Sequence, residues 1–280
     1  VVRETRDVAE GIRRIVLAPG QPVPAAAGSH VDVMVTIDGE KHRRSYSIVE
    51  THDGGRELAI SVFRTAASRG GSIFMHTLAP GDELEITQPL QNFPLRVGAP
   101  RYVLLAGGVG ITAILNMARV LKNVKADYRL VYAGRNRSAM AYLAELQAEH
   151  GAALEIHVDA EGSGLSVTEL VEGLQDGTEL YMCGPIRLMD AVRRSWRDHG
   201  LDPANLRYET FGNSGWYRPE EFIVRVPRLG LETRVGPGRS MLEALEDAGA
   251  DMMFDCRKGE CGLCEVRILD LEGKVDHRDV

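Results

Sequence analysis

The chain has 280 residues and a net charge of −7; hydrophobic residues make up 44% of it and charged residues 26%. This composition is typical of a soluble globular protein, and the length suffices for roughly two or three domains. The acidic balance argues against nucleic acid as the main partner, because a polyanion requires a basic footprint.

Nothing in the sequence pattern indicates secretion or membrane insertion. Charged residues crowd the N-terminus from Arg3 to Asp7, which argues against a secretory signal there. The longest uncharged run, residues 102–118, is interrupted by glycines and predicts a strand, a loop and a helix rather than a membrane span. Few cysteines, three of them clustered, fit a reducing compartment, so we expect a cytoplasmic protein.

The first hundred residues contain short apolar or alternating runs separated by turn signals such as Pro19-Gly20. Runs of β-strand length cover residues 12–17, 30–37, 58–63 and 83–87. Many short strands with regular turns are typical of a small antiparallel β-barrel, which we expect at residues 1–99.

The tetrapeptide Arg44-Ser45-Tyr46-Ser47 is the first candidate binding motif. On a strand, Arg44 and Tyr46 share one face, and the two serines share the other. A guanidinium beside a phenol suits a ligand that carries a phosphate and a flat polar ring. The structural alternative is a strand with one exposed arginine.

A second candidate motif, Arg69-Gly70-Gly71-Ser72, precedes an apolar run that predicts a short helix over residues 73–78. Backbone N–H groups before a helix can bind a phosphate, and Arg69 and Ser72 would add a charge and a hydroxyl. The alternative is an ordinary surface loop.

From residue 101 onward, strands and helices alternate. The predicted strands cover residues 102–106, 129–133, 154–158, 179–182 and 206–211. Repeated βα units predict a parallel, doubly wound α/β sheet, which we place at residues 100–211. Ligands on such sheets bind at the carboxyl ends of the strands.

Two turns of this domain fall at that edge. Gly107, Gly108, Gly110 and Thr112 follow the first strand, where a pyrophosphate could approach the backbone; a simple tight turn is the alternative. The tripeptide Cys183-Gly184-Pro185 lies at the last strand-to-helix switch, where a nicotinamide could lie.

Arg135 and Arg137 follow the second strand of this domain, where an adenosine ribose would reach. They could hold a 2′-phosphate or face solvent, and the sequence does not choose between these two roles.

Residues 212–220 read as a linker, and residues 221–280 as a third domain. A hairpin over 221–226 and 231–235, a helix capped by Ser240 and a strand over 265–269 are expected there. Cys256, Cys261 and Cys264 have the spacing C-x4-C-x2-C of a plant-type [2Fe–2S] site. A zinc knot or a disulfide-prone loop is the alternative.

The plant-type pattern includes a fourth cysteine further along the chain. The sequence has none between Cys264 and Val280, so we expect this domain to be C-terminally incomplete here.

The motifs, in this order along nearly the whole chain, resemble the phthalate dioxygenase reductase family, which includes vanillate O-demethylase reductase components. The resemblance implies an FMN-binding β-barrel, an NAD-binding α/β domain and an α+β ferredoxin-like domain of the β-grasp type. It also implies positions around the flavin: Arg44, Tyr46 and Ser47 would surround it, Arg69, Gly71 and Ser72 would hold its phosphate, and Phe211 would be the aromatic residue that covers its ring.

The function implied by the resemblance is that of an enzyme, an oxidoreductase. Electrons would pass from NADH, with NADPH as the alternative, through FMN and a [2Fe–2S] cluster to a Rieske-type oxygenase component. No side chain is required as a general acid or base, because the cofactors carry the chemistry. One competing hypothesis is the reductase module of a self-sufficient cytochrome P450 with a fused haem domain; another is a non-enzymatic cluster-bearing redox sensor or carrier.

Overall fold

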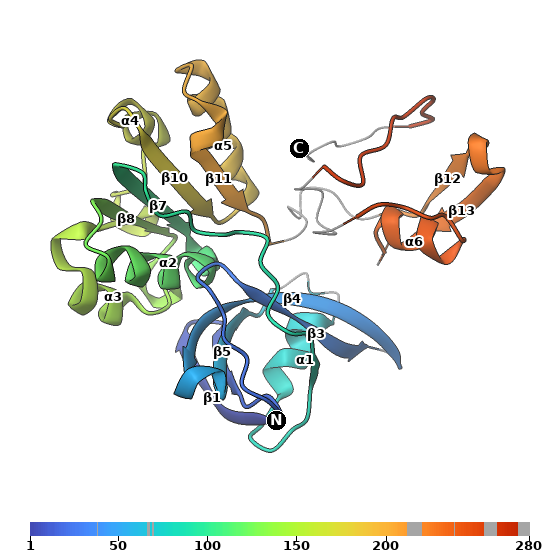
Figure 1. Ribbon diagram of the computed structural model, residues 1–280, viewed down its shortest axis with the longest axis horizontal. Helices are drawn as coiled ribbons and strands as arrows, with labels where there is room; N and C mark the ends of the chain where they lie inside the picture. Colours follow the sequence, from blue (N-terminus) through green and yellow to red (C-terminus); the bar gives the residue numbers. More distant parts are fainter. Residues whose placement is uncertain are drawn as a thin grey trace. The chain divides into compact units, whose positions relative to one another are not determined.

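The computed structural model describes residues 1–37, 39–65, 68, 70–211, 220–237, 239–254 and 262–273. The chain divides into two compact units, Val1–Phe211 and Gly212–Val280 (Figure 1). Each unit is described by itself.

The first unit begins with a six-stranded antiparallel sheet in the order β1-β2-β5-β4-β3-β6. Its strands are β1 (Val2–Ala9), β2 (Ile12–Leu17), β3 (His30–Ile37), β4 (Glu40–His52), β5 (Glu57–Phe63) and β6 (Glu85–Ile86). Helix α1 (Gly71–Thr77) contacts β3 and β5 (Figure 1). A core that includes Ile15, Val33, Ile60 and Met75 joins the helix to the sheet.

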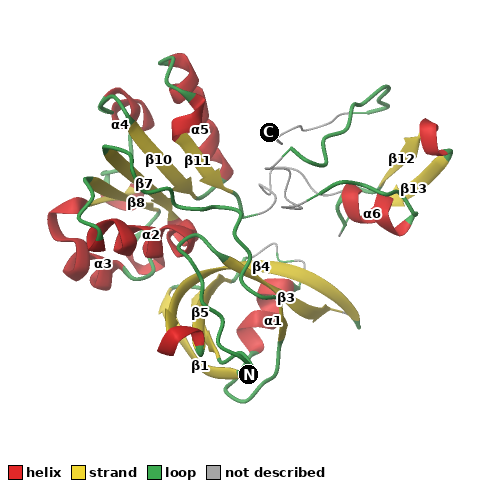
Figure 2. Ribbon diagram, in the orientation of Figure 1, coloured by secondary structure: helices red, strands yellow, loops and turns green. Residues whose placement is uncertain are grey.

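A five-stranded parallel sheet follows in the order β11-β10-β7-β8-β9. Its strands are β7 (Arg101–Gly107), β8 (Tyr128–Gly134), β9 (Leu154–Val158), β10 (Thr178–Cys183) and β11 (Leu206–Glu209). The helices between them are α2 (Ile111–Asn123), α3 (Leu143–His150), α4 (Val167–Glu172) and α5 (Ile186–Asp198), as Figure 2 shows.

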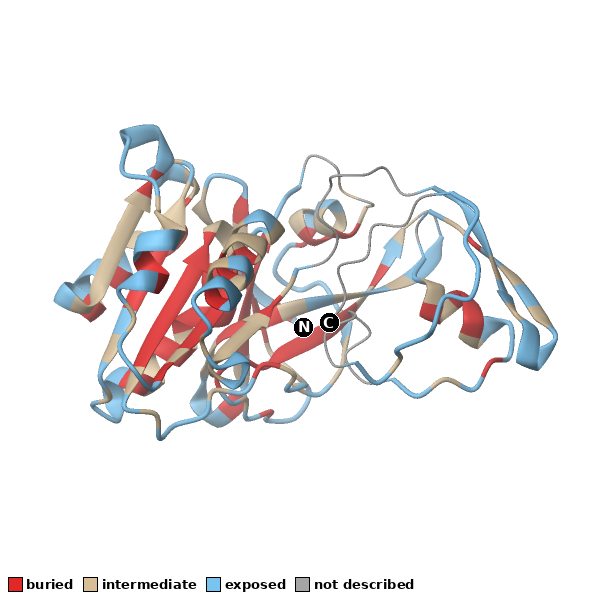
Figure 3. Ribbon diagram, turned by 90° about the horizontal axis from the view of Figure 1, so that it is seen from above, coloured by how far each residue is buried: buried red, intermediate tan, exposed pale blue. Residues whose placement is uncertain are grey.

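Successive side chains of a strand point to opposite faces, and β7 therefore contributes to two cores. Leu104 packs in one cluster with Ile114 of α2, whereas Leu105 packs in another with Trp196 of α5. The strands between these two layers are among the most buried parts of the unit (Figure 3).

The two sheets of the first unit share apolar and polar contacts. Ile12 of β2 and Val49 of β4 belong to the same core cluster as α2. Beside them, Glu50 accepts hydrogen bonds from Arg14 Nε at 3.0 Å and from Arg119 Nη1 at 3.4 Å. Burial alone would raise the pKa of Glu50, but the hydrogen bond and charge of Arg14 hold that pKa below its ordinary value.

The second unit contains the hairpin of β12 (Phe222–Val226) and β13 (Leu231–Val235), followed by α6 (Met241–Asp247). Ser240 and Glu243 form the expected capping box at the start of α6. The strand predicted over 265–269 is wrong, because the described residues 262–273 include no strand. An alternating apolar pattern does not suffice without a ladder partner: Val266, Ile268 and Leu269 are exposed by 42%, 51% and 74%.

Among the helices in the described part of the chain, none combines the length and the apolar character that crossing a membrane requires.

Candidate functional site

The carboxyl edge of the parallel sheet carries both predicted turns. The chain adds β8 and β9 on one side of β7 and then returns to place β10 on the other side. The turn after β7, Gly108–Gly110, and the turn after β10 therefore lie at the point where the strand order reverses. In open α/β sheets this point is where ligands bind.

The two turns pack directly against each other. A Cβ on Gly110 would lie 2.1 Å from the carbonyl oxygen of Cys183, and one on Gly184 would lie 3.0 Å from the Cα of Gly107. A Cβ on Gly107 would lie 2.7 Å from Cδ of Pro185. This close backbone approach accounts for the glycines at 107, 110 and 184.

Gly108 differs from these neighbours. Its φ is +53°, and a Cβ there would meet no heavy atom within 4 Å, so this part of the turn faces open space. Thr112 is buried, and its hydroxyl donates to the carbonyl of Val109 at 3.0 Å. The backbone at Gly108 is thus accessible to a ligand.

Glu209, at the end of β11, is a site residue that sequence reasoning missed. It pairs in register with Cys183 and is only 2% exposed. Ser47 Oγ of β4 donates to Glu209 Oε2 at 3.3 Å, so the two sheets meet here through a buried polar pair. Phe211 follows two residues later, and 43% of its surface is exposed. An acidic residue at the carboxyl end of a strand is the signal that could have found Glu209.

The other predicted residues of β4 divide as strand geometry requires. Arg44 and Tyr46 are half-buried, whereas Ser45 is exposed and donates to Asp32 Oδ1 at 2.6 Å. Burial raises the pKa of Tyr46 to about 12, against the opposing charge of Arg44. The Tyr46 phenol is therefore a neutral hydrogen-bonding group at physiological pH.

In the structure, Gly71 of the second candidate motif lies beside Arg44 of the first. A Cβ on Gly71, at the start of α1, would lie 2.9 Å from Nε of Arg44, so the arginine side chain lies against the helix start. The Gly70 N–H donates to Ser68 Oγ at 3.1 Å, and Ser72 Oγ donates to the same oxygen at 2.9 Å. Arg69 lies outside the described residues.

Arg135 and Arg137 follow β8 and adjoin the loop after β9. Arg135 is exposed, and its carbonyl accepts a hydrogen bond from Ala160 N at 3.0 Å. Arg137 donates from Nε and Nη2 to the two carboxylate oxygens of Glu161 at 2.7 and 2.9 Å. This hydrogen bonding and the charge of Glu161 raise the pKa of Arg137.

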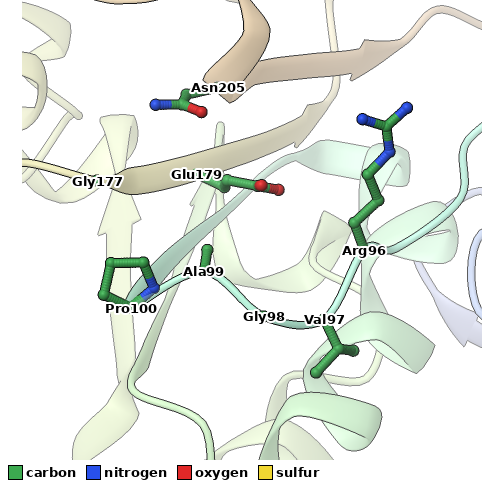
Figure 4. Close-up of a pocket in the computed structure, with 8 residues that line it drawn as sticks. All are labelled: Arg96, Val97, Gly98, Ala99, Pro100, Gly177, Glu179 and Asn205. Atoms are coloured by element: carbon green, nitrogen blue, oxygen red, sulfur yellow. The ribbon is translucent and has the colours of Figure 1, made fainter.

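A pocket of about 350 Å³ lies at the opposite, amino-terminal edge of the same sheet (Figure 4). Its lining comes from the segment before β7 and from residues that begin or precede β10 and β11: Arg96, Val97, Gly98, Ala99, Pro100, Gly177, Glu179 and Asn205. Because ligands of parallel sheets bind at the carboxyl edge, we do not take this pocket as the nucleotide site.

The predicted cluster ligands are only partly described. Cys264 lies within the described residues of the second unit, whereas Cys256 and Cys261 lie outside them. Three thiolates at this spacing suit iron or another soft metal ion.

Two family models match the chain, one within each compact unit. Residues 88–206 match the model of the dimethylamine monooxygenase subunit DmmA-like N-terminal domain. Residues 224–279 match the model of the 2Fe-2S iron-sulfur cluster binding domain. The carnitine monooxygenase reductase subunit of Acinetobacter pittii is 33% identical over 262 residues, which cover 93% of this chain and 84% of that protein.

Solved structures match the whole chain. Phthalate dioxygenase reductase is 31% identical with a TM-score of 0.78, and the match covers 100% of this chain and 88% of that one. An intact type IV self-sufficient cytochrome P450 monooxygenase is 34% identical with a TM-score of 0.76. This chain spans 36% of the P450 chain. The fold, the order of the motifs and the similarity along the full length lead to one conclusion: the chain belongs to the phthalate dioxygenase reductase family.

Proposed function

We propose that this chain is an NADH-dependent flavin and iron–sulfur reductase, which passes electrons to the Rieske-type oxygenase component of an aromatic-ring dioxygenase or O-demethylase. The observation that carries this proposal is the buried Ser47–Glu209 contact, at 3.3 Å, between the predicted flavin strand and the predicted nucleotide edge. The family membership supports the same electron path.

The residues of the first sheet fit FMN. Arg44 lies against Gly71 at the start of α1, so a guanidinium and backbone N–H groups converge where a phosphate would bind. Half-buried Tyr46 offers an apolar ring and a neutral hydroxyl to a flavin ring. When bound, FMN and the cluster supply acceptance of a hydride and release of single electrons.

The carboxyl edge of the parallel sheet would bind and orient the dinucleotide. The open backbone at Gly108 would accept the pyrophosphate, and the turn at Cys183-Gly184-Pro185 would hold the nicotinamide beside Glu209. Ser47 and Glu209 would fix the distance between the two rings, and the exposed side chain of Phe211 would cover the flavin until the nicotinamide arrives. Cys256, Cys261 and Cys264 would supply three of the four cluster ligands.

The finer architecture belongs to the same proposal. The antiparallel sheet would close as an FMN-binding barrel over residues 1–99, and a doubly wound NAD domain would occupy 100–211. Residues 212–220 would link these to a ferredoxin domain of the β-grasp type over 221–280. Thiolate ligands favour a reducing cytoplasm.

A second candidate function is the reductase module of a self-sufficient P450, with a fused haem domain as the electron acceptor. The observation that favours it is the 34% identity to the type IV enzyme over the whole of this chain. The complete open reading frame decides between the two, because only the fusion encodes a haem domain in the same polypeptide.

The proposal is tested by stopped-flow mixing of the FMN-reconstituted protein with NADH. We expect rapid bleaching of the flavin, followed by single-electron reduction of an external acceptor. Cys261→Ser should retain the first phase and lose the second, because it removes a ligand of the cluster alone. If NADH does not bleach the flavin of the wild-type protein, the reductase function is refuted.

Arg44→Ala tests the flavin site. We expect FMN affinity to fall about ten- to a hundredfold, the loss typical of charge-assisted hydrogen bonds to a phosphate. Arg43→Ala is the matched control, because Arg43 is the exposed neighbour on the same strand. Equal FMN-to-protein ratios for the two variants after purification would show that Arg44 does not hold the flavin.

A further inference from the structure

The loops that follow β8 and β9 carry an ion pair that bears on which dinucleotide the chain uses. Both nitrogens of the Arg137 fork engage Glu161, at 2.7 and 2.9 Å. The loops are also joined by the hydrogen bond from Ala160 N to the Arg135 carbonyl at 3.0 Å. They lie at the carboxyl edge, one strand and two strands away from the glycine turn after β7.

The loop after β8 is held in place from the other side as well. The Glu10 N–H donates to the Ser138 carbonyl at 2.7 Å, and Ser138 Oγ donates to Glu10 Oε2 at 2.8 Å. Tyr142, at the end of this loop, shares a buried 2.6 Å hydrogen bond with Ser61 of β5. The Arg137 backbone is therefore fixed on both sides, and the side chain reaches Glu161 from an ordered position.

The charges of the two loops cancel. Residues 135–139 contain two arginines, and residues 159–163 contain Asp159 and Glu161. A dinucleotide with a 2′-phosphate brings about two further negative charges, whereas one with a 2′-hydroxyl brings none. A 2′-phosphate would have to displace the Glu161 carboxylate from Arg137 and remain close to it, which is unfavourable between like charges. A 2′-hydroxyl, in contrast, can donate to a carboxylate without breaking the pair.

We propose that Glu161 is a specificity-determining residue: by holding Arg137 in a bidentate pair, it makes the adenosine end of the site select NADH over NADPH. This inference rests on the proposed function, since it concerns the nucleotide of the same site. It names a residue for which the sequence offered no role, and it assigns Arg137, whose role the sequence left open, as the partner of Glu161.

The test compares Glu161→Gln with the wild-type full chain. We expect the wild type to favour NADH in kcat/KM for flavin reduction. Glu161→Gln should raise the NADPH-to-NADH ratio of kcat/KM about tenfold, because it releases Arg137 and removes a like charge. Calorimetry with 2′,5′-ADP and 5′-ADP should show a similar relative gain for 2′,5′-ADP, and this binding measurement requires no electron transfer.

Two further variants identify the cause. In Arg137→Ala/Glu161→Gln the gain in 2′,5′-ADP affinity should disappear; a gain that survives would overturn the role of the pair. Glu172→Gln, an exposed glutamate of α4 with the same change of charge, should leave both ratios as in the wild type. An unchanged ratio in Glu161→Gln, or a wild type that favours NADPH, would also overturn the inference. If neither nucleotide bleaches the flavin, the proposed function fails, and the calorimetry still decides the role of Glu161.

Discussion

The two edges of the parallel sheet differ in how their polar groups are used. At the amino edge, the Tyr102 hydroxyl accepts from the N–H groups of Gly98 and Ala99, both at 2.7 Å, and donates to the Arg96 carbonyl at 3.1 Å. The Tyr181 hydroxyl accepts from Arg96 N at 3.0 Å. Residues 96–99, in the segment that joins the two sheets, are thus held by the hydroxyls of Tyr102 and Tyr181, which form hydrogen bonds within the fold.

At the carboxyl edge, the backbones of the two turns are in close contact, but one part of the first turn faces open space. Gly107, Gly110 and Gly184 leave no room for a side chain, whereas Gly108 borders open space. The pocket lies at the amino edge, whereas the proposed nucleotide site lies at the carboxyl edge, so the proposal does not rest on hollow space. Three substitutions test this difference between the two edges.

Gly110→Ala should have the largest effect. Its Cβ would lie 2.1 Å from the Cys183 carbonyl oxygen, a backbone atom that cannot move aside without shifting the turn after β10. We expect a loss of about 3 kcal/mol in the free energy of unfolding and loss of NADH-dependent flavin reduction. Denaturant unfolding measures the first effect and stopped-flow the second. Gly20→Ala, where the added Cβ meets nothing within 4 Å, is the control; equal stability of the two variants would contradict the packing argument.

Ser47→Ala should have an intermediate effect, on rate rather than on folding. It removes the hydroxyl that donates to Glu209. We expect flavin reduction by NADH to slow about tenfold, as for the loss of one positioning hydrogen bond of about 1.4 kcal/mol, with FMN still bound. Thr36→Ala, at an exposed hydroxyl on the neighbouring strand β3, should react at the wild-type rate. A wild-type rate in Ser47→Ala would remove this pair from the site.

Tyr102→Phe should have the smallest effect on activity. It leaves the N–H groups of Gly98 and Ala99 without the phenol oxygen, and we expect a loss of about 1–2 kcal/mol in the free energy of unfolding. The rate of flavin reduction should stay at the wild-type value, because the proposed nucleotide site lies at the opposite edge of the sheet. If Tyr102→Phe slowed that reaction as much as Ser47→Ala, the two edges would not be functionally distinct.

The strands that were predicted well are those with local signals. The strand Leu154–Val158 is predicted at its observed bounds, because Leu154, Ile156 and Val158 alternate with polar residues in the two-residue period of a strand. β1 is missed, because its charged residues leave no two-residue alternation, its register with β2 shifts twice, and the pairing with β2 decides its structure. The strand expected over 265–269 failed for the opposite reason: its pattern is right, but no described ladder pairs with it.

In the candidate site, too, residues with a local sequence signal could be predicted and those that depend on long-range contacts could not. The motifs around Arg44, Gly107 and Cys183 could be found because each is a short stretch of unusual composition. Glu209 belongs to no such stretch: its only local signal is an acidic side chain at the end of a strand, and its partner Ser47, 162 positions away, is brought to it by the fold. The pairing of Arg137 with Glu161 is likewise a contact between two loops, so the sequence left the role of that arginine open.

The apolar cluster that Ile12 and Val49 share with α2 bears on how such reductases can be recombined. A crossover between two genes near residue 99 would separate side chains that pack in one core. In the hybrid protein, the two sides of that core would come from different parents and would not fit each other. A crossover near residue 212 falls where one compact unit ends and the next begins. Recombination between genes of this family should therefore transfer residues 1–211 together and the iron–sulfur unit separately.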